Sequence, residues 1–326
     1  MNKKVVFLGT GGTIAGQAES ASDNVGYKAA QVGIGNLLGS VPGLLRALGP
    51  LAAESEQVLQ LNSKDMTFPD WLRLAGRLAH HLGRDDVTGV VVTHGTDTLE
   101  ETAYFLHRLL PFLPSPNKPV VLTCAMRPAS SAHADGPGNL ADATAVVMSP
   151  HASGVLVVCA GKVHSGLHVQ KVHPYRLEAF DSGEAGPLGY VEEGVVRFIS
   201  RLEPAQASPL VLPKLQSAPC PRVEIVTSHS GATGGLVLDM LAAQRSARSR
   251  LAGIVVAGTG NGSVHIELEA ALLEAVQQGV WVWRSSRCAY GQVVEATTGS
   301  EERFLSVGLS PAKARIEMVL QLLMQS

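Results

Sequence analysis

Short apolar segments alternate with longer segments of helical periodicity, and this alternation limits the fold more than any other feature of the chain. The apolar segments are rich in valine and isoleucine and are bounded by glycine or proline, as expected for strands buried on both faces. They are residues Lys4–Gly9, Thr88–Thr93, Pro119–Thr123, Gly154–Cys159, Val223–Thr227, Gly253–Ala257 and Gly279–Trp283. Strands that alternate with helices predict an α/β fold with a mostly parallel sheet.

Helices are predicted between these strands and after the last of them. One apolar helix face is formed by Trp71, Leu74, Ala75, Leu78 and Leu82, and another by Ala103, Leu106 and Leu110. Ser310 followed by Pro311 is typical of a helix start, and it predicts a helix that runs towards Leu323.

A proline-rich segment divides the chain. Residues 204–221 contain five prolines, a density that disfavours helix and central strand and predicts an interdomain linker. Residues 1–203 then form a larger N-terminal domain, with a mostly parallel sheet flanked by helices. Residues 222–326 form a smaller C-terminal α/β domain, and the 326-residue length suits this division.

The composition restricts the partners and the compartment. A formal net charge of −2 argues against nucleic-acid and anionic-membrane partners, and no apolar run is long enough to span a membrane. Four cysteines without CxxC spacing favour reduced thiols over a zinc site. The apolar run Val5–Leu8 is too short for a signal peptide, so a cytoplasmic protein is predicted.

Two polar segments follow predicted strands, where ligands bind in parallel sheets. The first is Gly9-Thr10-Gly11-Gly12-Thr13-Ile14-Ala15-Gly16, and the second is Thr93-His94-Gly95-Thr96-Asp97-Thr98-Leu99-Glu100-Glu101. The first lacks the third glycine of a dinucleotide motif and the Gly-Lys-Ser/Thr of a P-loop. Alone, the first also fits a tight turn, and in the second Asp97 or Thr98 could simply cap a helix.

Together, the two segments resemble the two signature motifs of bacterial-type L-asparaginases, the type II-like asparaginase/glutaminase family. The similarity continues through Ala125–Arg127, Asp135–Leu140, Gly186–Tyr190, Gly258–Gly262 and Arg284–Arg287, and so spans nearly the whole chain. It implies an amidohydrolase that converts L-asparagine to L-aspartate and ammonia through an acyl-enzyme. It also implies a homo-oligomer, a tetramer built of dimers.

The resemblance implies a role for individual residues. The catalytic set is Thr13 as nucleophile, Tyr27 as its activating partner on a lid of roughly residues 16–32, and Thr96, Asp97 and Lys171 as an internal triad. The substrate-binding set is Ser63 and Lys64, Asp97 for the α-ammonium, the Ala125 backbone for the oxyanion, and Asn261 and Glu295 from a neighbouring subunit. Taken singly, Tyr27, Ser63 and Lys171 also fit a packing, loop or surface residue, so the assignment depends on the whole pattern.

Lys64 departs from the family, whose members often carry an acceptor at this position. At an effective dielectric near 20, two like charges roughly 5 Å apart repel by about 3 kcal/mol, so Lys64 is expected to turn away from the α-ammonium. The opposite arrangement, in which Lys64 binds the α-carboxylate, stays open. His94 is expected to pack or hydrogen-bond. Because His164, His168 and His173 lack metal-ligand spacing, no metal or other cofactor is predicted.

Three alternative functions stay open. A glutaminase-asparaginase with comparable activity on L-glutamine differs by one methylene of substrate, worth about 1–3 kcal/mol. An amidotransferase subunit needs a further N-terminal domain and an RNA-binding partner, whereas the first motif begins near residue 1. An amino-acid sensor on the same fold has no need of the two hydroxyls and the lysine. The sequence leaves open which threonine attacks first.

Overall fold

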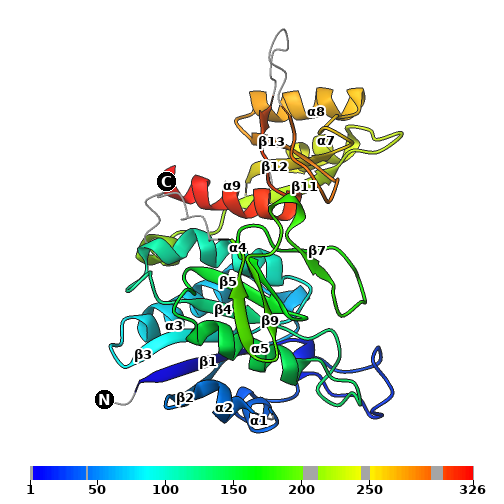
Figure 1. Ribbon diagram of the computed structural model, residues 1–326. Coiled ribbons are helices and arrows are strands. Elements are labelled where there is room, and N and C mark those ends of the chain that lie inside the picture. Colours follow the sequence, from blue (N-terminus) through cyan, green and yellow to red (C-terminus); the bar gives the residue numbers. More distant parts are fainter. Residues whose placement is uncertain (1–2, 42, 201–211, 244–249, 295–303, 326) are drawn as a thin grey trace. The chain divides into compact units, whose positions relative to one another are not determined.

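The structure is a computed structural model that describes residues 3–41, 43–200, 212–243, 250–294 and 304–325. The chain divides into two compact units, Met1–Gln216 and Ser217–Ser326. Each unit has its own sheet and its own helices (Figure 1). The division falls inside the segment predicted as a linker.

Eight strands form the main sheet of the first unit, in the order β10-β9-β6-β5-β4-β3-β1-β2. Their bounds are β1 Lys4–Gly11, β2 Ala52–Leu61, β3 Val87–Thr93, β4 Val120–Thr123, β5 Val155–Cys159, β6 Lys162–Ser165, β9 Gly189–Glu192 and β10 Val195–Phe198. Neighbours from β5 to β2 are parallel, whereas the β5–β6, β6–β9 and β9–β10 pairs are antiparallel. The ends of β1, β3 and β4 therefore meet at one edge.

Helices cover both faces of this sheet. They are α1 Ile34–Gly39, α2 Leu44–Leu48, α3 Phe68–Leu82, α4 Leu99–Leu109 and α5 Gly136–Met148. Val5 and Phe7 of β1 share a core cluster with residues of α1, α2 and α5. Val6 and Leu8 point to the opposite face and are also fully buried. Because α3 and α4 also contact the strands, we assign them to that second face.

A parallel four-stranded sheet forms the second unit, in the order β11-β12-β13-β14. Its elements are β11 Arg222–Thr227, β12 Leu251–Gly258, β13 Trp281–Ser286, β14 Leu305–Ser306, α7 Gly235–Ala243, α8 Ile266–Gln277 and α9 Pro311–Gln325. Residues of α7 and α8 share a core with β12. Gly253 faces Met318 with no room for a Cβ, so α9 packs directly on β12.

All of the predicted strands and helices are present. The predicted strands correspond to β1, β3, β4, β5, β11, β12 and β13, and the predicted helices to α3, α4 and α9. The apolar face predicted from Trp71 to Leu82 is buried. Pro311 is the first residue of α9, and the Ser310 carbonyl accepts the Ala314 N–H at 2.8 Å.

The structure differs from expectation in several features, since β2, β6, β9, β10 and β14 were not among the predicted strands. The edge strand β2 was not predicted, because most of its residues are polar or small and much of it is solvent-exposed. Within the predicted linker, Leu212–Ser217 forms the short helix α6. The proline density was expected to disfavour a helix there. However, Pro213 lies in the first turn, where the missing N–H removes no intrahelical bond.

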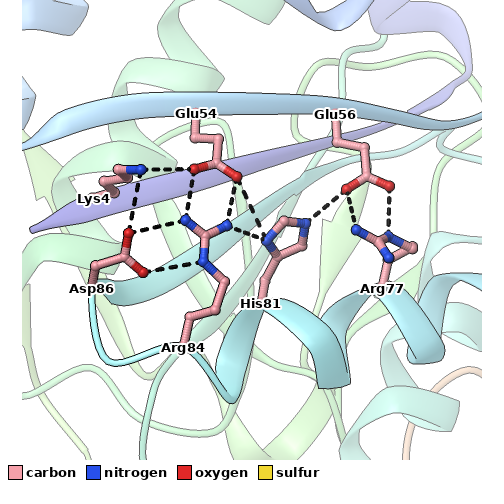
Figure 2. Close-up of polar contacts among 7 residues, drawn as sticks. All are labelled: Lys4, Glu54, Glu56, Arg77, His81, Arg84 and Asp86. Atoms are coloured by element: carbon pink, nitrogen blue, oxygen red, sulfur yellow. Dashed lines mark hydrogen bonds and ion pairs between the residues drawn. The ribbon is translucent and has the colours of Figure 1, made fainter.

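A charged network ties β2 to β1 and to the end of α3 (Figure 2). It consists of Lys4, Glu54, Glu56, Arg77, His81, Arg84 and Asp86. Arg84 donates to both oxygens of Glu54 at 2.6 and 2.8 Å, and it lowers the pKa of Glu54 and Asp86 to about 2. His81 Nδ1 lies 3.1 Å from Arg84, which can only donate, so Nε2–H donates to Glu56 at 2.7 Å. The network thus holds the exposed edge strand by charge-assisted bonds.

Candidate active site

The two motif segments touch backbone to backbone beyond the ends of β1 and β3. Gly11 and Gly12 have φ values of 99° and 81°, and the Gly12 Cα faces Gly95 with no room for a side chain. Thr10 Oγ1 donates to the Thr93 carbonyl at 2.9 Å and locks the two strand ends together. Glycine is therefore needed at these positions to bring the segments that carry Thr13 and Thr96 side by side.

Thr13 is paired with Tyr27. Their hydroxyl oxygens are 2.7 Å apart, and the Thr13 side chain is buried whereas Tyr27 is half-buried. The Tyr27 ring lies on Gly16, where a Cβ would come within 2.7 Å of the ring carbon Cδ2. A threonine hydroxyl needs a neighbour that takes its proton during attack, and Tyr27 is in place for this.

The lid segment that carries Tyr27 is bonded to the rest of the first unit. Gln17 and Lys28 pair through their backbones, each N–H···O distance being 2.9 Å. Ser130 Oγ accepts the Ala18 N–H at 2.8 Å, and Ser131 Oγ donates to the Asn24 side chain at 2.6 Å. These bonds hold residues 17–28, the segment that carries Tyr27, against the rest of the first unit.

Lys171 joins the second motif from a separate two-stranded ribbon, β7 Gln170–Lys171 and β8 Phe180–Asp181. Its Nζ donates to Thr96 Oγ1 at 2.9 Å and to Asp97 Oδ1 at 2.8 Å. Because Thr96 accepts this bond, its own hydrogen is free to point at another group. The Asp97 side chain is 51% exposed, which leaves Oδ2 open to a ligand.

Ser63 follows β2 and lies against the second motif. The residue is buried, and Thr98 Oγ1 donates to its carbonyl at 2.8 Å. Its own hydroxyl Oγ is buried with no hydrogen-bond partner among the described residues. Leaving a buried hydroxyl unbonded costs about 1–3 kcal/mol, so this atom has the character of a ligand contact. By contrast, Lys64 is exposed and its Nζ lies 2.9 Å from the Asp65 carboxylate.

Ala125 follows β4 and lies on a loop that is held by two side chains. Asp135 accepts the N–H groups of Met126 and Arg127, both at 2.9 Å. Asn139 Nδ2 donates to the Cys124 carbonyl at 3.0 Å. We did not assign roles to Asp135 and Asn139 from the sequence, although both belong to the Asp135–Leu140 segment that resembles the family. Their function is visible only as contacts across the fold.

His94 is fully buried beside the second motif and takes part in a hydrogen-bond chain. Its Nδ1 lies 2.8 Å from the Gly95 carbonyl, and its Nε2 lies 3.0 Å from Thr102 Oγ1. Trp71 Nε1 donates to the same Thr102 hydroxyl at 2.8 Å. Burial lowers the pKa of His94 to about 4, so the ring is neutral near pH 7. This arrangement fits the expected packing and hydrogen-bonding role.

The remaining predicted contacts belong to the second unit. Asn261 lies in a turn after β12, where its Nδ2 donates to the Val294 carbonyl at 2.8 Å and its Oδ1 accepts the Val294 N–H at 2.7 Å. A second N–H and a second lone pair stay available on this exposed amide. Glu295 lies outside the described residues.

Neither a metal-holding group nor a membrane-spanning helix is found among the described residues. Among them no group of three or more His, Cys, Asp or Glu side chains is arranged to hold a metal ion. No helix in the described part of the chain has the length and apolarity to cross a bilayer. The cysteines are free. Cys124 and Cys159 lie with their sulfurs 3.8 Å apart, and this hydrogen bond, together with burial, raises the pKa of the Cys124 thiol.

The first unit brings together a buried threonine bonded to a tyrosine and a second threonine bonded to a lysine near the strand ends, and hydroxyls with such partners are suited to nucleophilic chemistry. Comparison with known protein families identifies the family of this chain. The family model Asparaginase, N-terminal matches residues 4–204, and Glutaminase/Asparaginase C-terminal domain matches residues 222–326. The chain belongs to the asparaginase family of amidohydrolases.

Among the similar proteins, some are named L-asparaginase and others glutaminase-asparaginase. L-asparaginase 2 of Bacillus subtilis is 35% identical over 319 residues, covering 97% of this chain and 81% of that protein. Glutaminase-asparaginase of Pseudomonas fluorescens is 38% identical over 322 residues, covering 96% and 84%. A crystal structure of a probable cytoplasmic L-asparaginase from Campylobacter jejuni has a TM-score of 0.89 and 37% identity, covering 98% and 95% of the two chains.

Proposed function

We propose that this chain is an L-asparaginase that hydrolyses L-asparagine to L-aspartate and ammonia through an acyl-enzyme on Thr13. The observation that carries the proposal is the arrangement of two hydroxyl systems at adjacent strand ends. Thr13 is bonded to Tyr27, and Thr96 is bonded to Lys171. This pair of hydroxyls suits a two-step hydrolysis. One hydroxyl forms the ester with the substrate, and the other orients the water molecule that cleaves the ester.

In the first step, Thr13 Oγ1 attacks the carbonyl carbon of the side-chain amide. As the C–O bond forms, its proton passes to the Tyr27 oxygen, 2.7 Å away, while Tyr27 gives up its own proton toward the departing nitrogen. Backbone N–H groups of the loop at Ala125, which Asp135 holds in place, stabilise the negative oxygen of the tetrahedral intermediate. The C–N bond then breaks, and the nitrogen leaves as ammonia after gaining a proton.

In the second step, a water molecule attacks the ester. The Thr96 hydroxyl accepts a bond from Lys171 and keeps a second lone pair to orient this water. Lys171 supplies a positive field that stabilises the negative charge developing on the water oxygen. The ester C–O bond breaks, the proton given up by the attacking water passes to the Thr13 oxygen, and aspartate is released.

The ends of the substrate fit two further groups. The Ser63 hydroxyl, buried and unbonded, is suited to the α-carboxylate, and the free oxygen of Asp97 is suited to the α-ammonium. Lys64 is engaged with Asp65, which supports the interpretation that it turns away from the ammonium. Asparagine supplies both charges at one end and the amide at the other.

L-Glutamine is the competing substrate. It is longer by one methylene, a difference worth about 1–3 kcal/mol in a pocket. The relatives named glutaminase-asparaginase make comparable activity on glutamine the second candidate function.

The assembly and the compartment complete the proposal. We propose a homo-oligomer, a tetramer of dimers, in which Asn261 and Glu295 complete a neighbour's site. The exposed Asn261 amide supports this, since it keeps donor and acceptor capacity beyond its bonds to Val294. We also propose a cytoplasmic enzyme, in keeping with the description of the Campylobacter jejuni protein.

The test measures ammonia release from L-asparagine and L-glutamine side by side, with the Thr13→Ala variant as control. We expect turnover of asparagine that falls by orders of magnitude in the variant, because the ester can no longer form. Comparable turnover of glutamine selects the second candidate. No release from either substrate, or near-normal turnover by Thr13→Ala, rejects the proposed mechanism, and the latter outcome points to Thr96.

A further inference from the structure

Lys171 lies on a short ribbon that depends on outside contacts for its position. β7 has two residues, and Lys171 pairs with Phe180 of β8 in a sheet separate from the main one. A two-stranded ribbon of this length is not stable by itself. On the β8 side, Ser182 Oγ lies 2.8 Å from Nδ1 of His164, a buried residue of β6. On the β7 side, the buried Val169 donates its N–H to the Ser165 carbonyl at 2.9 Å, and a further attachment holds Lys171 itself.

That attachment comes from Glu100, in the first turn of α4. Glu100 Oε2 accepts the backbone N–H of Lys171 at 2.5 Å. A bond from an N–H to a carboxylate is short and strong among protein hydrogen bonds. Residues 96–100 therefore accept three hydrogen bonds from Lys171. Thr96 and Asp97 accept from its Nζ, and Glu100 accepts from its backbone N–H.

We propose that Glu100 is a positioning residue, which fixes the Lys171 backbone so that the ammonium group reaches Thr96 and Asp97 together. The inference rests on the proposed function, in which Lys171 and Thr96 serve the hydrolysis of the ester. Without the Glu100 bond, the Lys171 backbone loses its direct tie to the segment that carries Thr96 and Asp97. The lysine then loses the fixed geometry on which the second step depends.

A purely electrostatic role is the main alternative. Acidic residues in the first turn stabilise a helix through its dipole, and both Glu100 and Glu101 lie in that turn of α4. The two roles respond differently to side-chain length and charge. A glutamine at residue 100 keeps the reach and an acceptor oxygen but loses the charge, whereas an aspartate keeps the charge and loses the reach.

The experiment compares kcat and KM for asparagine in Glu100→Ala, Glu100→Gln and Glu100→Asp, with Glu101→Gln as matched control. We expect Glu100→Ala to lower kcat at least 10-fold. Glu100→Gln should restore most of the loss, Glu100→Asp should restore less, and Glu101→Gln should stay within 2-fold of the parent chain. If aspartate restores more than glutamine, or Glu101→Gln loses as much kcat as Glu100→Ala, the positioning role is rejected.

A double-mutant cycle tests whether Glu100 acts through Lys171. In a Lys171→Met background, Glu100→Ala should lower the remaining kcat by less than 2-fold, because there is no ammonium left to position. A further 10-fold loss in that background overturns the proposal. Melting temperatures of all variants identify loss of fold, and the contrast between Glu100→Gln and Glu100→Asp keeps the test valid if Glu100→Ala does not fold.

Amide hydrogen exchange at Lys171 gives a readout that does not need activity. We expect protection of this N–H in the parent chain and in Glu100→Gln, and at least 10-fold faster exchange in Glu100→Ala. Equal protection in all three overturns the proposal. A parent chain that protects Lys171 but hydrolyses neither amino acid separates failure of the proposed function from failure of this inference.

Discussion

The hydroxyl oxygens of Thr13 and Tyr27 lie 2.7 Å apart, although the two residues are 14 positions apart in the chain. This distance suits direct proton transfer between the two hydroxyls. The position of the tyrosine ring is set separately, by its packing on Gly16. The hydroxyl and the ring of Tyr27 therefore have separable roles.

Tyr27→Phe removes the hydroxyl and keeps the ring. We expect kcat for asparagine to fall by about 10²–10⁴, the range for loss of a general base, with a smaller change in KM. Steady-state kinetics on both substrates provide the measurement. Tyr190→Phe is the control. The Tyr190 ring, on β9, lies under the guanidinium of Arg197 on β10, and this variant should keep the kcat of the parent chain. Near-normal kcat in Tyr27→Phe excludes Tyr27 as the proton acceptor.

Asp135→Asn tests the loop that carries Ala125. An asparagine can accept only one of the two N–H groups that the carboxylate now accepts, so the backbone should lose its fixed orientation. We expect kcat to fall about 10–100-fold with less change in KM. Asp70→Asn, which removes an equal charge from the cap of α3, should lower only the melting temperature. Equal losses of kcat in both variants contradict a specific role for Asp135.

Lys64→Gln tests the departure from the family. If Lys64 is held away by Asp65 and the ammonium depends on Asp97, the glutamine adds an acceptor and should lower KM about 3–10-fold with little change in kcat. Asp65→Asn releases the lysine and should raise KM. Progress curves at low asparagine concentration resolve both shifts. A clear rise of KM in Lys64→Gln would instead assign Lys64 to the α-carboxylate.

Subunit exchange tests the shared site. Thr13→Ala and Asn261→Ala proteins should each be nearly inactive, because the first lacks the nucleophile and the second lacks the contact offered to a neighbour. Mixing them under conditions that exchange subunits should restore part of the activity. The control is the same mixture without exchange, monitored by mass spectrometry. Proven exchange with no recovery counts against a site completed by a second copy.

The charged network predicts a loss of stability in acid. Glu54 and Asp86 have folded pKa values of about 2, below their values of roughly 4 in an unfolded chain. A lowered pKa stabilises the fold above pH 4, and this contribution disappears as the pH falls from about 4 to 2. Glu54→Gln should therefore lower the melting temperature at pH 7 and converge with the parent near pH 2.

A matched variant separates this network from ordinary surface pairs. Glu192, which pairs with Arg197, is 65% exposed, so Glu192→Gln should change the melting temperature very little at any pH. Thermal unfolding from pH 2 to pH 8 gives both comparisons. A pH-independent effect of Glu54→Gln contradicts the electrostatic origin.

Much of the fold could be predicted because it depends on local pattern. Runs such as Val87–Thr93 are rich in valine and almost entirely buried, as is typical of strands covered on both faces. The edge strand β2 escaped prediction for the opposite reason. Its polar residues are stabilised by Arg84 and Arg77, which are distant in sequence, and no local pattern encodes these partners.

The candidate site divides in the same way. The sequence by itself determined the residue types at the strand ends, because the glycines and threonines of each motif are contiguous and the resemblance to one family follows from them. Only the tertiary structure decided which atoms meet: Glu100 on the Lys171 backbone, Asp135 on two amides, and Ser63 with its hydroxyl unbonded. The physical reason is that hydrogen bonds form between atoms placed within about 3 Å, and such closeness between distant residues arises only when the chain folds.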